Sequence, residues 1–118
     1  MPEKARVFAA EDDPDYLDTM KIELGIKGHT LALTATTLEE ALKAIETFPT
    51  AGIQIAALDG NLKRGVKSGS DGRQMVAAIR NISPSVKIIG MSGESMEGVD
   101  IDLGKDRIYE LGKVVTEL

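Results

Sequence analysis

Carboxylates follow two apolar segments of the chain, at the point where each segment ends. Glu11 and Asp12 come directly after the run 6–10, and Asp59 closes the run 53–58. Apolar runs of this length between helical patterns are typical of buried parallel strands. The carboxyl ends of parallel strands meet at the functional edge of an open sheet. Because clustered carboxylates repel one another unless a proton or cation lies between them, this pattern predicts oxygen ligands for a hard divalent metal.

Two further polar groups follow later apolar segments. Ser92 comes after the run 86–91, and Lys105 comes after a weak run at 100–103. Phosphoryl transfer requires an in-line nucleophile, Mg²⁺ to neutralise the phosphoryl oxygens, and donors to those oxygens. Asp59 can be the nucleophile, because carboxylates form covalent acyl phosphates. In this hypothesis Ser92 donates to one phosphoryl oxygen and Lys105 pairs with another.

The remaining candidate groups are metal ligands in the same hypothesis. Asp12 and Asp59 bind Mg²⁺, and Glu11 holds the ion directly or through water. The backbone carbonyl of Asn61, two residues beyond Asp59, lies within reach of the same ion. The expected cofactor is therefore Mg²⁺.

Each of these residues has a simpler interpretation when it is considered alone. Asp13, which precedes Pro14, is typical of a helix cap rather than a ligand. Ser92-Gly93 is as typical of a turn as of a phosphate donor, and Lys105 alone is typical of a surface lysine. The coincidence of all these groups at predicted strand ends is what favours a phosphoryl-transfer site.

Alternating strand and helix patterns must position these groups. The periodicity predicts strands near 5–10, 29–33, 53–58, 86–91 and 100–103, with helices near 14–25, from Thr36 or Thr37 to a break at Pro49, near 71–82 and from about 107 to the end. Strict alternation of this kind implies an α/β protein with a doubly wound parallel sheet. The 118 residues are enough for one domain, which we expect to cover 1–118.

Composition excludes several functional classes. The net charge of −5 opposes nonspecific binding to nucleic acid, and no apolar run approaches the length of a membrane span. The sequence has no cysteine and a single histidine, His29, which excludes disulfides, cysteine nucleophiles and a multi-histidine metal site within one chain. Because the N-terminus shows no signal-peptide pattern, we expect a cytoplasmic protein.

The order of these motifs resembles the receiver domain of two-component response regulators, over essentially the whole chain. Each motif is weak alone, and their order at successive strand ends is what makes the resemblance specific. The residues that carry it are the acidic cluster 11–13, Asp59, Ser92-Gly93 and Gly104-Lys105, with additional agreement at Asp71-Gly72 and Gly98-Val99-Asp100.

The resemblance implies a flavodoxin-like sheet of five strands in the order 2-1-3-4-5. It implies that Asp59 accepts a phosphoryl group from a histidine kinase or a histidine phosphotransfer protein, with Mg²⁺ as cofactor. Such a domain is not an enzyme beyond its own phosphorylation and slow dephosphorylation. It signals through protein–protein contacts with a downstream partner and involves neither nucleic acid nor membrane.

The segment between the fourth and fifth strands departs from the family pattern. Only twelve residues separate Ser92 from Lys105, where the family usually has a full helix and the fifth strand. The part 93–99 contains two glycines, so we expect this fourth helix of the family to be missing or reduced to a turn. Asp102 and Leu103 stand where an aromatic switch residue is common, so that switch is expected to be absent.

These departures affect the expected output surface more than the phosphorylation chemistry. The family normally builds its output surface on the fourth helix, the fifth strand and the fifth helix. The loop 60–70 is also longer than usual and basic, with Lys63, Arg64 and Lys67. We hypothesise that this basic cluster gates the phosphate or contacts a partner.

Two alternative functions stay open from the sequence. A degenerate receiver would act as a protein-binding module that does not depend on phosphorylation. The segment 57–62 also resembles the motif of haloacid-dehalogenase-like phosphatases, in which two aspartates lie two residues apart. The nucleophile of that motif would fall at Ala57, which has no nucleophilic side chain.

Overall fold

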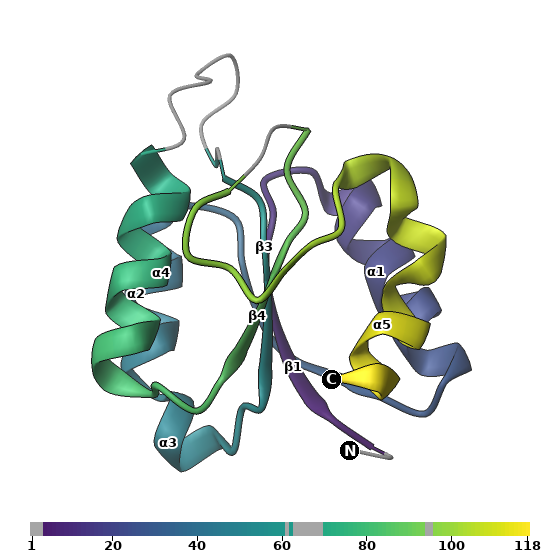
Figure 1. Cartoon of the computed structure of the whole chain (residues 1–118), viewed down its shortest axis with the longest axis horizontal. Coiled ribbons are helices and arrows are strands. Elements are labelled where there is room, and N and C mark those ends of the chain that lie inside the picture. The colour runs from purple at the N-terminus through teal and green to yellow at the C-terminus, as the bar shows by residue number, and fades with distance from the viewer. Residues whose placement is uncertain (1–3, 61, 63–69, 94–95) are drawn as a thin grey trace.

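The computed structural model describes residues 4–60, 62, 70–93 and 96–118, and in these residues five parallel strands form one sheet (Figure 1). The strands are β1 (Arg6–Ala10), β2 (Thr30–Ala35), β3 (Ile55–Leu58), β4 (Lys87–Gly90) and β5 (Ile101–Asp102). Their order is β2-β1-β3-β4-β5, and every pairing is parallel. The predicted doubly wound α/β sheet and its strand order are both confirmed.

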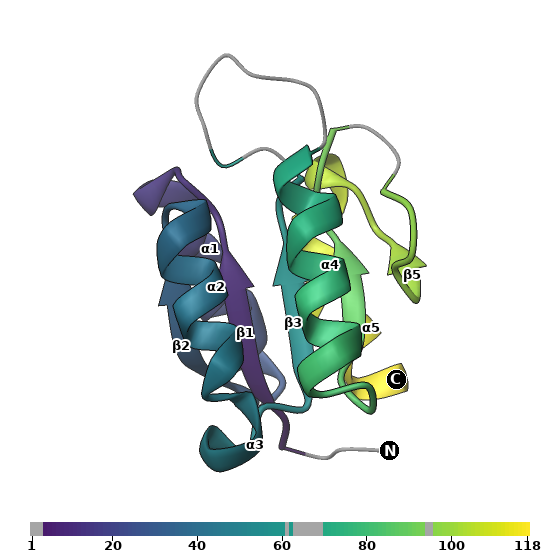
Figure 2. The ribbon, with the colours of Figure 1, turned by 90° about the vertical axis from the view of Figure 1, so that its left-hand side faces the viewer.

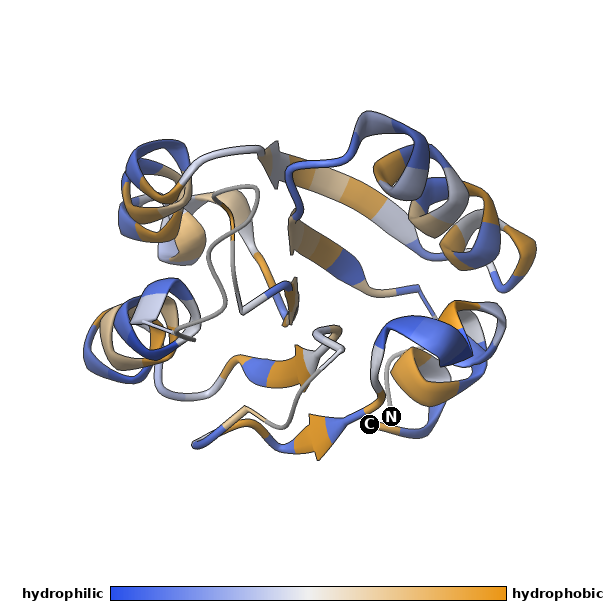
Figure 3. Cartoon of the chain, turned by 90° about the horizontal axis from the view of Figure 1, so that it is seen from above, coloured by the Kyte–Doolittle hydropathy of each residue, from blue (hydrophilic) through white to orange (hydrophobic). Residues whose placement is uncertain are grey.

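Helices cover both faces of the sheet (Figure 1). One face carries α1 (Pro14–Ile26) and α5 (Leu111–Glu117), and the other carries α2 (Leu38–Glu46) and α4 (Ser70–Ile82). Seen from above, the largely hydrophobic strands lie between these two helical layers (Figure 3). None of the helices in the described part of the chain has the length and apolar character needed to span a membrane.

The buried apolar side chains form a separate cluster on each face. Under α2 and α4, the rings of Phe8 and Phe48 meet edge to face with their centroids 5.1 Å apart, an arrangement that aromatic pairs prefer. Met20, Met75 and Met91, which the apolar patterns predict as core residues, are all buried. The sheet is therefore fixed from both sides, and its strand ends are held in place.

Local sequence signals explain where the helices before and after β2 begin. The Asp13 side chain accepts a hydrogen bond from the Asp15 N–H at 3.0 Å, and Pro14 occupies the first turn of α1. The Thr37 side chain accepts from the Glu40 N–H at 3.1 Å and caps α2. Both contacts satisfy amide groups that lack a partner within the helix. The prediction that Asp13 is a cap is confirmed.

Two predicted helix boundaries are wrong. The second helix ends at Glu46, and Pro49 lies in the first turn of a further short helix, α3 (Phe48–Ala51), where proline loses no hydrogen bond. The last helix does not begin near Arg107, because Lys105–Glu110 forms a 3₁₀ helix, η1, before α5 starts. Over so short a segment, a three-residue spacing of apolar side chains does not separate 3₁₀ from α-helix.

The connection from β4 to β5 contains no helix in its described residues, 91–93 and 96–100, which confirms the predicted loss (Figure 2). Met96 and Val99 pack against the core cluster under α4 instead. Gly72 in α4 and Gly90 at the end of β4 make room for Met96, because a Cβ on Gly72 would lie 2.8 Å from the Met96 Cε atom and one on Gly90 would lie 3.3 Å from its sulfur. Packing thus replaces part of the missing helix.

A side-chain clamp holds the same connection. The Arg80 guanidinium donates to the carbonyls of Val86 and Gly98 at 3.2 and 2.8 Å and pairs with Asp100 Oδ2 at 3.1 Å. Asp100 Oδ2 also accepts from the Ile88 N–H at 2.7 Å. Arg80 therefore ties α4 to Val86, before β4, and to the last residues of the helix-free connection.

Candidate functional site

The backbone hydrogen bonds of the sheet continue past the strands to Glu11 and Asp59. The Glu11 N–H donates to the Ala35 carbonyl at 3.0 Å, and the Asp59 N–H donates to the Ala10 carbonyl at 2.9 Å. Both residues directly follow a strand, so the ladder places them at one edge of the sheet. Lys105 reaches this edge from beyond β5, as the first residue of η1.

The ammonium of Lys105 lies between two buried carboxylates. Lys105 Nζ is 3.1 Å from Glu11 Oε2 and 3.3 Å from Asp59 Oδ2. The exposed fraction is 36% for the Lys105 side chain, 7% for Asp59 and 0% for Glu11. Because paired charges are held most firmly when they are shielded from water, this arrangement gives a defined charge cluster rather than a loose surface pair.

Asp12 completes the acidic part of this cluster. One carboxylate oxygen from each of Glu11, Asp12 and Asp59 lies within 4.8 Å of the others. Asp12 is partly exposed, so the cluster opens to solvent on its side. Neighbouring Asp13 caps α1, and its N–H donates to Glu11 Oε1 at 3.2 Å, which helps to orient the Glu11 carboxylate.

The electrostatics of the cluster favour a bound cation. Burial, a hydrogen bond with Asp12 and the negative charge of Asp59 raise the pKa of Glu11 to about 7, although Lys105 acts in the opposite direction. Burial lowers the pKa of Lys105, but the charges of Asp59 and Glu11 outweigh it and raise that pKa above its ordinary value. The site therefore carries excess negative charge that one lysine only partly balances.

The residues present fit a divalent metal with oxygen ligands. Glu11 Oε2 is buried and, in the described part of the chain, receives no well-directed hydrogen bond although Lys105 Nζ is near it. Ligands of Mg²⁺ lie about 2.1 Å from the ion, so two of them are at most about 4.2 Å apart. The three carboxylate oxygens thus need only a small inward movement to share one ion.

Ser92 lies beside the same edge, and Asn61 falls outside the described residues. Ser92 is buried just after β4, and a Cβ on Gly60 would lie 3.4 Å from its Oγ atom. The hydroxyl therefore neighbours the residue that follows Asp59. The predicted basic loop residues, Lys63, Arg64 and Lys67, lie outside the described residues as well.

Sequence reasoning missed Tyr16, which contacts Lys105 in two ways. The Tyr16 hydroxyl donates to the backbone carbonyl of Lys105 at 2.7 Å. Lys105 Nζ lies 5.1 Å from the centroid of the Tyr16 ring. The available signal was the position of Tyr16 four residues before Met20, on the side of α1 that the apolar stripe predicts to be buried.

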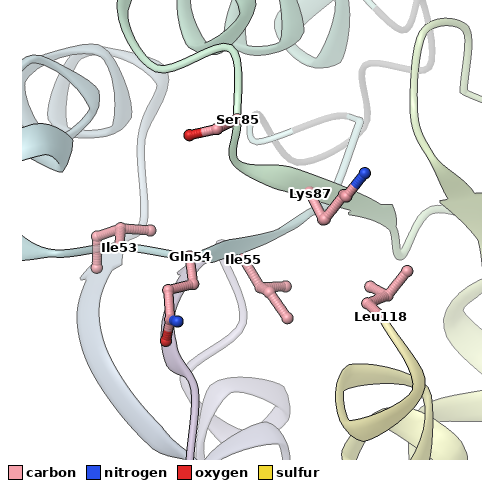
Figure 4. Close-up of a pocket in the computed structure, with 6 residues that line it drawn as sticks. All are labelled: Ile53, Gln54, Ile55, Ser85, Lys87 and Leu118. Atoms are coloured by element: carbon pink, nitrogen blue, oxygen red, sulfur yellow. The ribbon is translucent and has the colours of Figure 1, made fainter. Parts of the chain in front are cut away.

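A pocket of about 220 Å³ lies at the opposite edge of the sheet (Figure 4). It is smaller than typical ligand pockets of about 300–1,000 Å³. No carboxylate side chain lines it, so we do not assign the chemistry to it. Its lining residues are Ile53, Gln54, Ile55, Ser85, Lys87 and Leu118.

A parallel sheet in the order 2-1-3-4-5 is the flavodoxin-like fold, and in this chain acidic residues lie at its carboxyl edge. No protein-family model matches the chain, and no curated protein matches its sequence. The solved structures that it resembles include receiver domains of response regulators. The fold is therefore the receiver-domain fold, as the motif resemblance implied.

Three of these structures show the extent of the similarity. The signal receiver domain of NarL, described as a response regulator of Mycobacterium tuberculosis, has 24% identity and a TM-score of 0.76, covering 98% of this chain and 96% of that one. A CheY-like receiver domain protein of Methanospirillum hungatei JF-1 has 22% identity and a TM-score of 0.75, covering 96% and 91%. A chain from the CheX–CheY complex of Borrelia burgdorferi with BeF₃ and Mg²⁺ has 19% identity and a TM-score of 0.66, covering 79% and 65%.

Proposed function

We propose that the chain is a phosphoacceptor receiver domain of a two-component signalling system. Asp59 accepts a phosphoryl group from a histidine kinase or a histidine phosphotransfer protein. The observation that carries this proposal is the ammonium of Lys105, which lies between the buried carboxylates of Glu11 and Asp59 at the carboxyl edge of the sheet. The receiver-domain fold supports it.

In the proposed reaction, a carboxylate oxygen of Asp59 forms a bond to phosphorus while the bond from phosphorus to the donor breaks. The electron pair of the broken bond leaves with the donor. Lys105 pairs with a phosphoryl oxygen, and the Ser92 hydroxyl donates a hydrogen bond to another. These groups stabilise the charge that the phosphoryl oxygens carry during an in-line transfer.

Glu11, Asp12 and Asp59 would hold Mg²⁺, together with the backbone carbonyl of Asn61. Their carboxylate oxygens already lie within 4.8 Å of one another. A bound Mg²⁺ neutralises phosphoryl oxygens and lets a carboxylate approach the negatively charged donor. The resemblance to a chain from a complex that contains BeF₃ and Mg²⁺ also supports Mg²⁺ as the ion.

The proposed output is a protein–protein contact rather than turnover of a separate substrate. Slow hydrolysis of the aspartyl phosphate by water returns Asp59 to its free carboxylate. The downstream partner is a protein that distinguishes the two states of Asp59. The role is consistent with the cytoplasmic location that the sequence leads us to expect.

Phosphorylation by a small donor tests this function directly. The protein is incubated with Mg²⁺ and an acyl phosphate, and its intact mass is measured over time. We expect a gain of one phosphoryl group that requires Mg²⁺ and is lost in Asp59→Asn. The matched control is Asp18→Asn, which changes an exposed carboxylate of α1 and should be phosphorylated normally.

Other outcomes separate the alternatives. A protein that gains no phosphoryl group, or gains one in Asp59→Asn, is not a phosphoacceptor at this residue. Partner binding without any phosphorylation would identify a degenerate receiver. Turnover of a phosphomonoester would identify a phosphatase, against which the lack of a nucleophilic side chain at Ala57 argues.

A further inference from the structure

Tyr16 and Lys105 are 89 residues apart in the sequence and contact each other twice. We propose that Tyr16 is a positioning residue for phosphoryl transfer, which holds the Lys105 ammonium beside Asp59. This inference rests on the proposed function, because it concerns the lysine assigned there to the phosphoryl oxygens. In this inference the phenol acts through Lys105, to whose carbonyl it donates a hydrogen bond.

The strand that delivers Lys105 fixes it poorly. β5 contains two residues, and its register with β4 consists of Ile89 with Ile101 and Gly90 with Asp102. Lys105 then follows Gly104, which has φ of +81°, a conformation in which glycine has no side-chain restraint. A lysine at such a junction needs an additional anchor if its ammonium is to occupy one position.

The Tyr16 hydroxyl supplies an anchor for the backbone of Lys105. It donates to the Lys105 carbonyl at 2.7 Å from helix α1, which the core cluster beside α5 holds against the sheet. Burial and the negative charges of Glu11, Asp59 and Asp106 raise the pKa of Tyr16. The hydroxyl therefore keeps its proton and remains a donor at physiological pH.

The Tyr16 ring supplies an anchor for the other end of the side chain. Lys105 Nζ lies 5.1 Å from the ring centroid, within the range of a cation–π interaction. On its other sides the ammonium meets Glu11 and Asp59 at 3.1 and 3.3 Å. A lysine side chain has considerable rotamer freedom to lose, so a contact at each end restricts it more than the carboxylates alone.

The test distinguishes the effect of the Tyr16 hydroxyl from that of its ring, and both from a general effect on the fold. Tyr16→Phe removes the hydroxyl and keeps the ring, whereas Tyr16→Leu removes both. The matched controls are Tyr109→Phe and Tyr109→Leu in η1, because Tyr109 is 75% exposed. Two quantities are measured in the full chain: the order parameter of the Lys105 Cε–H bonds without any donor, and the rate of Asp59 phosphorylation by an acyl phosphate with Mg²⁺.

We expect the Lys105 order parameter to fall toward that of exposed lysines in Tyr16→Leu, with a smaller fall in Tyr16→Phe. The phosphorylation rate should fall roughly threefold to tenfold in Tyr16→Leu and less in Tyr16→Phe, in proportion to one lost hydrogen bond and one lost cation–π contact. The Tyr109 variants should change neither quantity. Tyr16→Phe keeps the partly buried ring, so an effect of this variant is not a consequence of lost packing.

The two proposals fail in distinguishable ways. An unchanged Lys105 order parameter in both Tyr16 variants overturns the positioning role, even if Asp59 is phosphorylated normally. A changed order parameter without phosphorylation of the unaltered protein supports the positioning of Lys105 and contradicts the proposed function. A tenfold slower rate with unchanged Lys105 order also overturns the inference, because Tyr16 would then act by another route.

Discussion

Two parts of this sheet's carboxyl edge are built in different ways. Where β1 and β3 end, ladder hydrogen bonds continue into Glu11 and Asp59, and Lys105 lies between their carboxylates. Between β4 and β5, a helix is missing from the described residues, and Met96 packing and the Arg80 clamp take its place. The charge cluster therefore depends on strand ends, whereas the connection depends on side chains, and the two should respond separately to mutation.

Removing the Lys105 ammonium should have the largest effect and should act on the charge cluster alone. Lys105→Met keeps an unbranched side chain of nearly the same length without the ammonium, and we expect phosphorylation of Asp59 to slow about 10²–10³-fold, the usual loss when one preorganised charge-stabilising group is removed. Time-resolved mass spectrometry measures the rate. Lys113→Met, in an exposed position of α5, is the control. Loss of amide protection between β4 and β5 in Lys105→Met would contradict the separation of the two regions.

Gly72→Ala should have the next largest effect, because α4 touches both regions. The Gly72 N–H donates to the Gly60 carbonyl at 2.9 Å, and an added Cβ would lie 2.9 Å from Gly60 Cα. We expect urea denaturation to show a loss of about 1–3 kcal/mol in the free energy of unfolding through overpacking.

Gly25→Ala is the matched control for that substitution. A Cβ on Gly25 would meet nothing within 4 Å. Alanine is favoured over glycine in a helix by about 1 kcal/mol, so this variant should be slightly more stable than the unaltered protein. A Gly72→Ala variant that gains stability in the same way would show that Met96 and Gly60 are not tightly packed against α4.

Arg80→Ala should have a smaller effect and should open the connection without affecting the charge cluster. The guanidinium is partly exposed, so solvent screening limits its contribution, and we expect a loss of about 1 kcal/mol in the free energy of unfolding. Hydrogen exchange should show faster exchange at the amides of Ile88 and Asp100, with an unchanged rate of Asp59 phosphorylation. Lys43→Ala removes the exposed pair with Glu39 and should change little. Slower phosphorylation in Arg80→Ala would show that the connection and the charge cluster do not respond separately to mutation.

The smallest expected effect is a pH dependence at His29, remote from both regions. His29 Nδ1 accepts from the Ala5 N–H at 3.0 Å, and Nε2 is 2.8 Å from Thr116 Oγ1. Because Thr116 Oγ1 donates its proton to the Gly112 carbonyl, the tautomer inferred for His29 carries its proton on Nε2. Burial lowers the pKa of His29 below its ordinary value of 6.5. As the pH falls through 6.5, the unfolded chain therefore binds a proton at His29 before the folded protein does, and the free energy of unfolding decreases.

Protonation of Glu11 changes the stability in the opposite direction to that of His29, so a mutation is needed to separate the two contributions. The pKa of Glu11 is raised from 4.5 to about 7 in the folded protein, so the folded state binds that proton first and gains stability as the pH falls through this range. Urea denaturation gives the free energy of unfolding of the unaltered protein and of His29→Gln across this pH range. The difference between the two proteins at each pH is the contribution of the histidine. Identical pH dependence in both proteins would show that His29 is not held neutral.

Much of the fold could be predicted because its signals are local and periodic. Apolar runs and caps such as Asp13 identified the strands and helices in order, and the parallel arrangement then placed Glu11 and Asp59 at one edge. The short spacing from Ser92 to Lys105, with two glycines in 93–99, was enough to predict a missing helix. These inferences need only the period of the pattern and the direction of the strands.

The contacts that hold the site could not be predicted in the same way. Tyr16 reaches across 89 residues to Lys105, and Arg80 reaches across 20 to Asp100, and neither pair has a recognisable spacing. The place of Tyr16 near the apolar stripe of α1 indicated burial but not its contact with Lys105. The segment of η1 is too short for the sequence to distinguish a 3₁₀ helix from an α-helix. Such contacts depend on how elements pack, which a single sequence does not reveal.

The shortness of β5 has a further consequence for where another chain could add a strand to this sheet. A two-residue strand at the border of a sheet exposes few unpaired amides and carbonyls, and such borders resist edge-to-edge aggregation. The opposite border, β2, has six residues and, among the described strands, pairs with β1 alone, so it offers a longer edge for strand addition. A second chain that extended this sheet by strand addition would therefore add beside β2, on the far side of the molecule from the shortened connection.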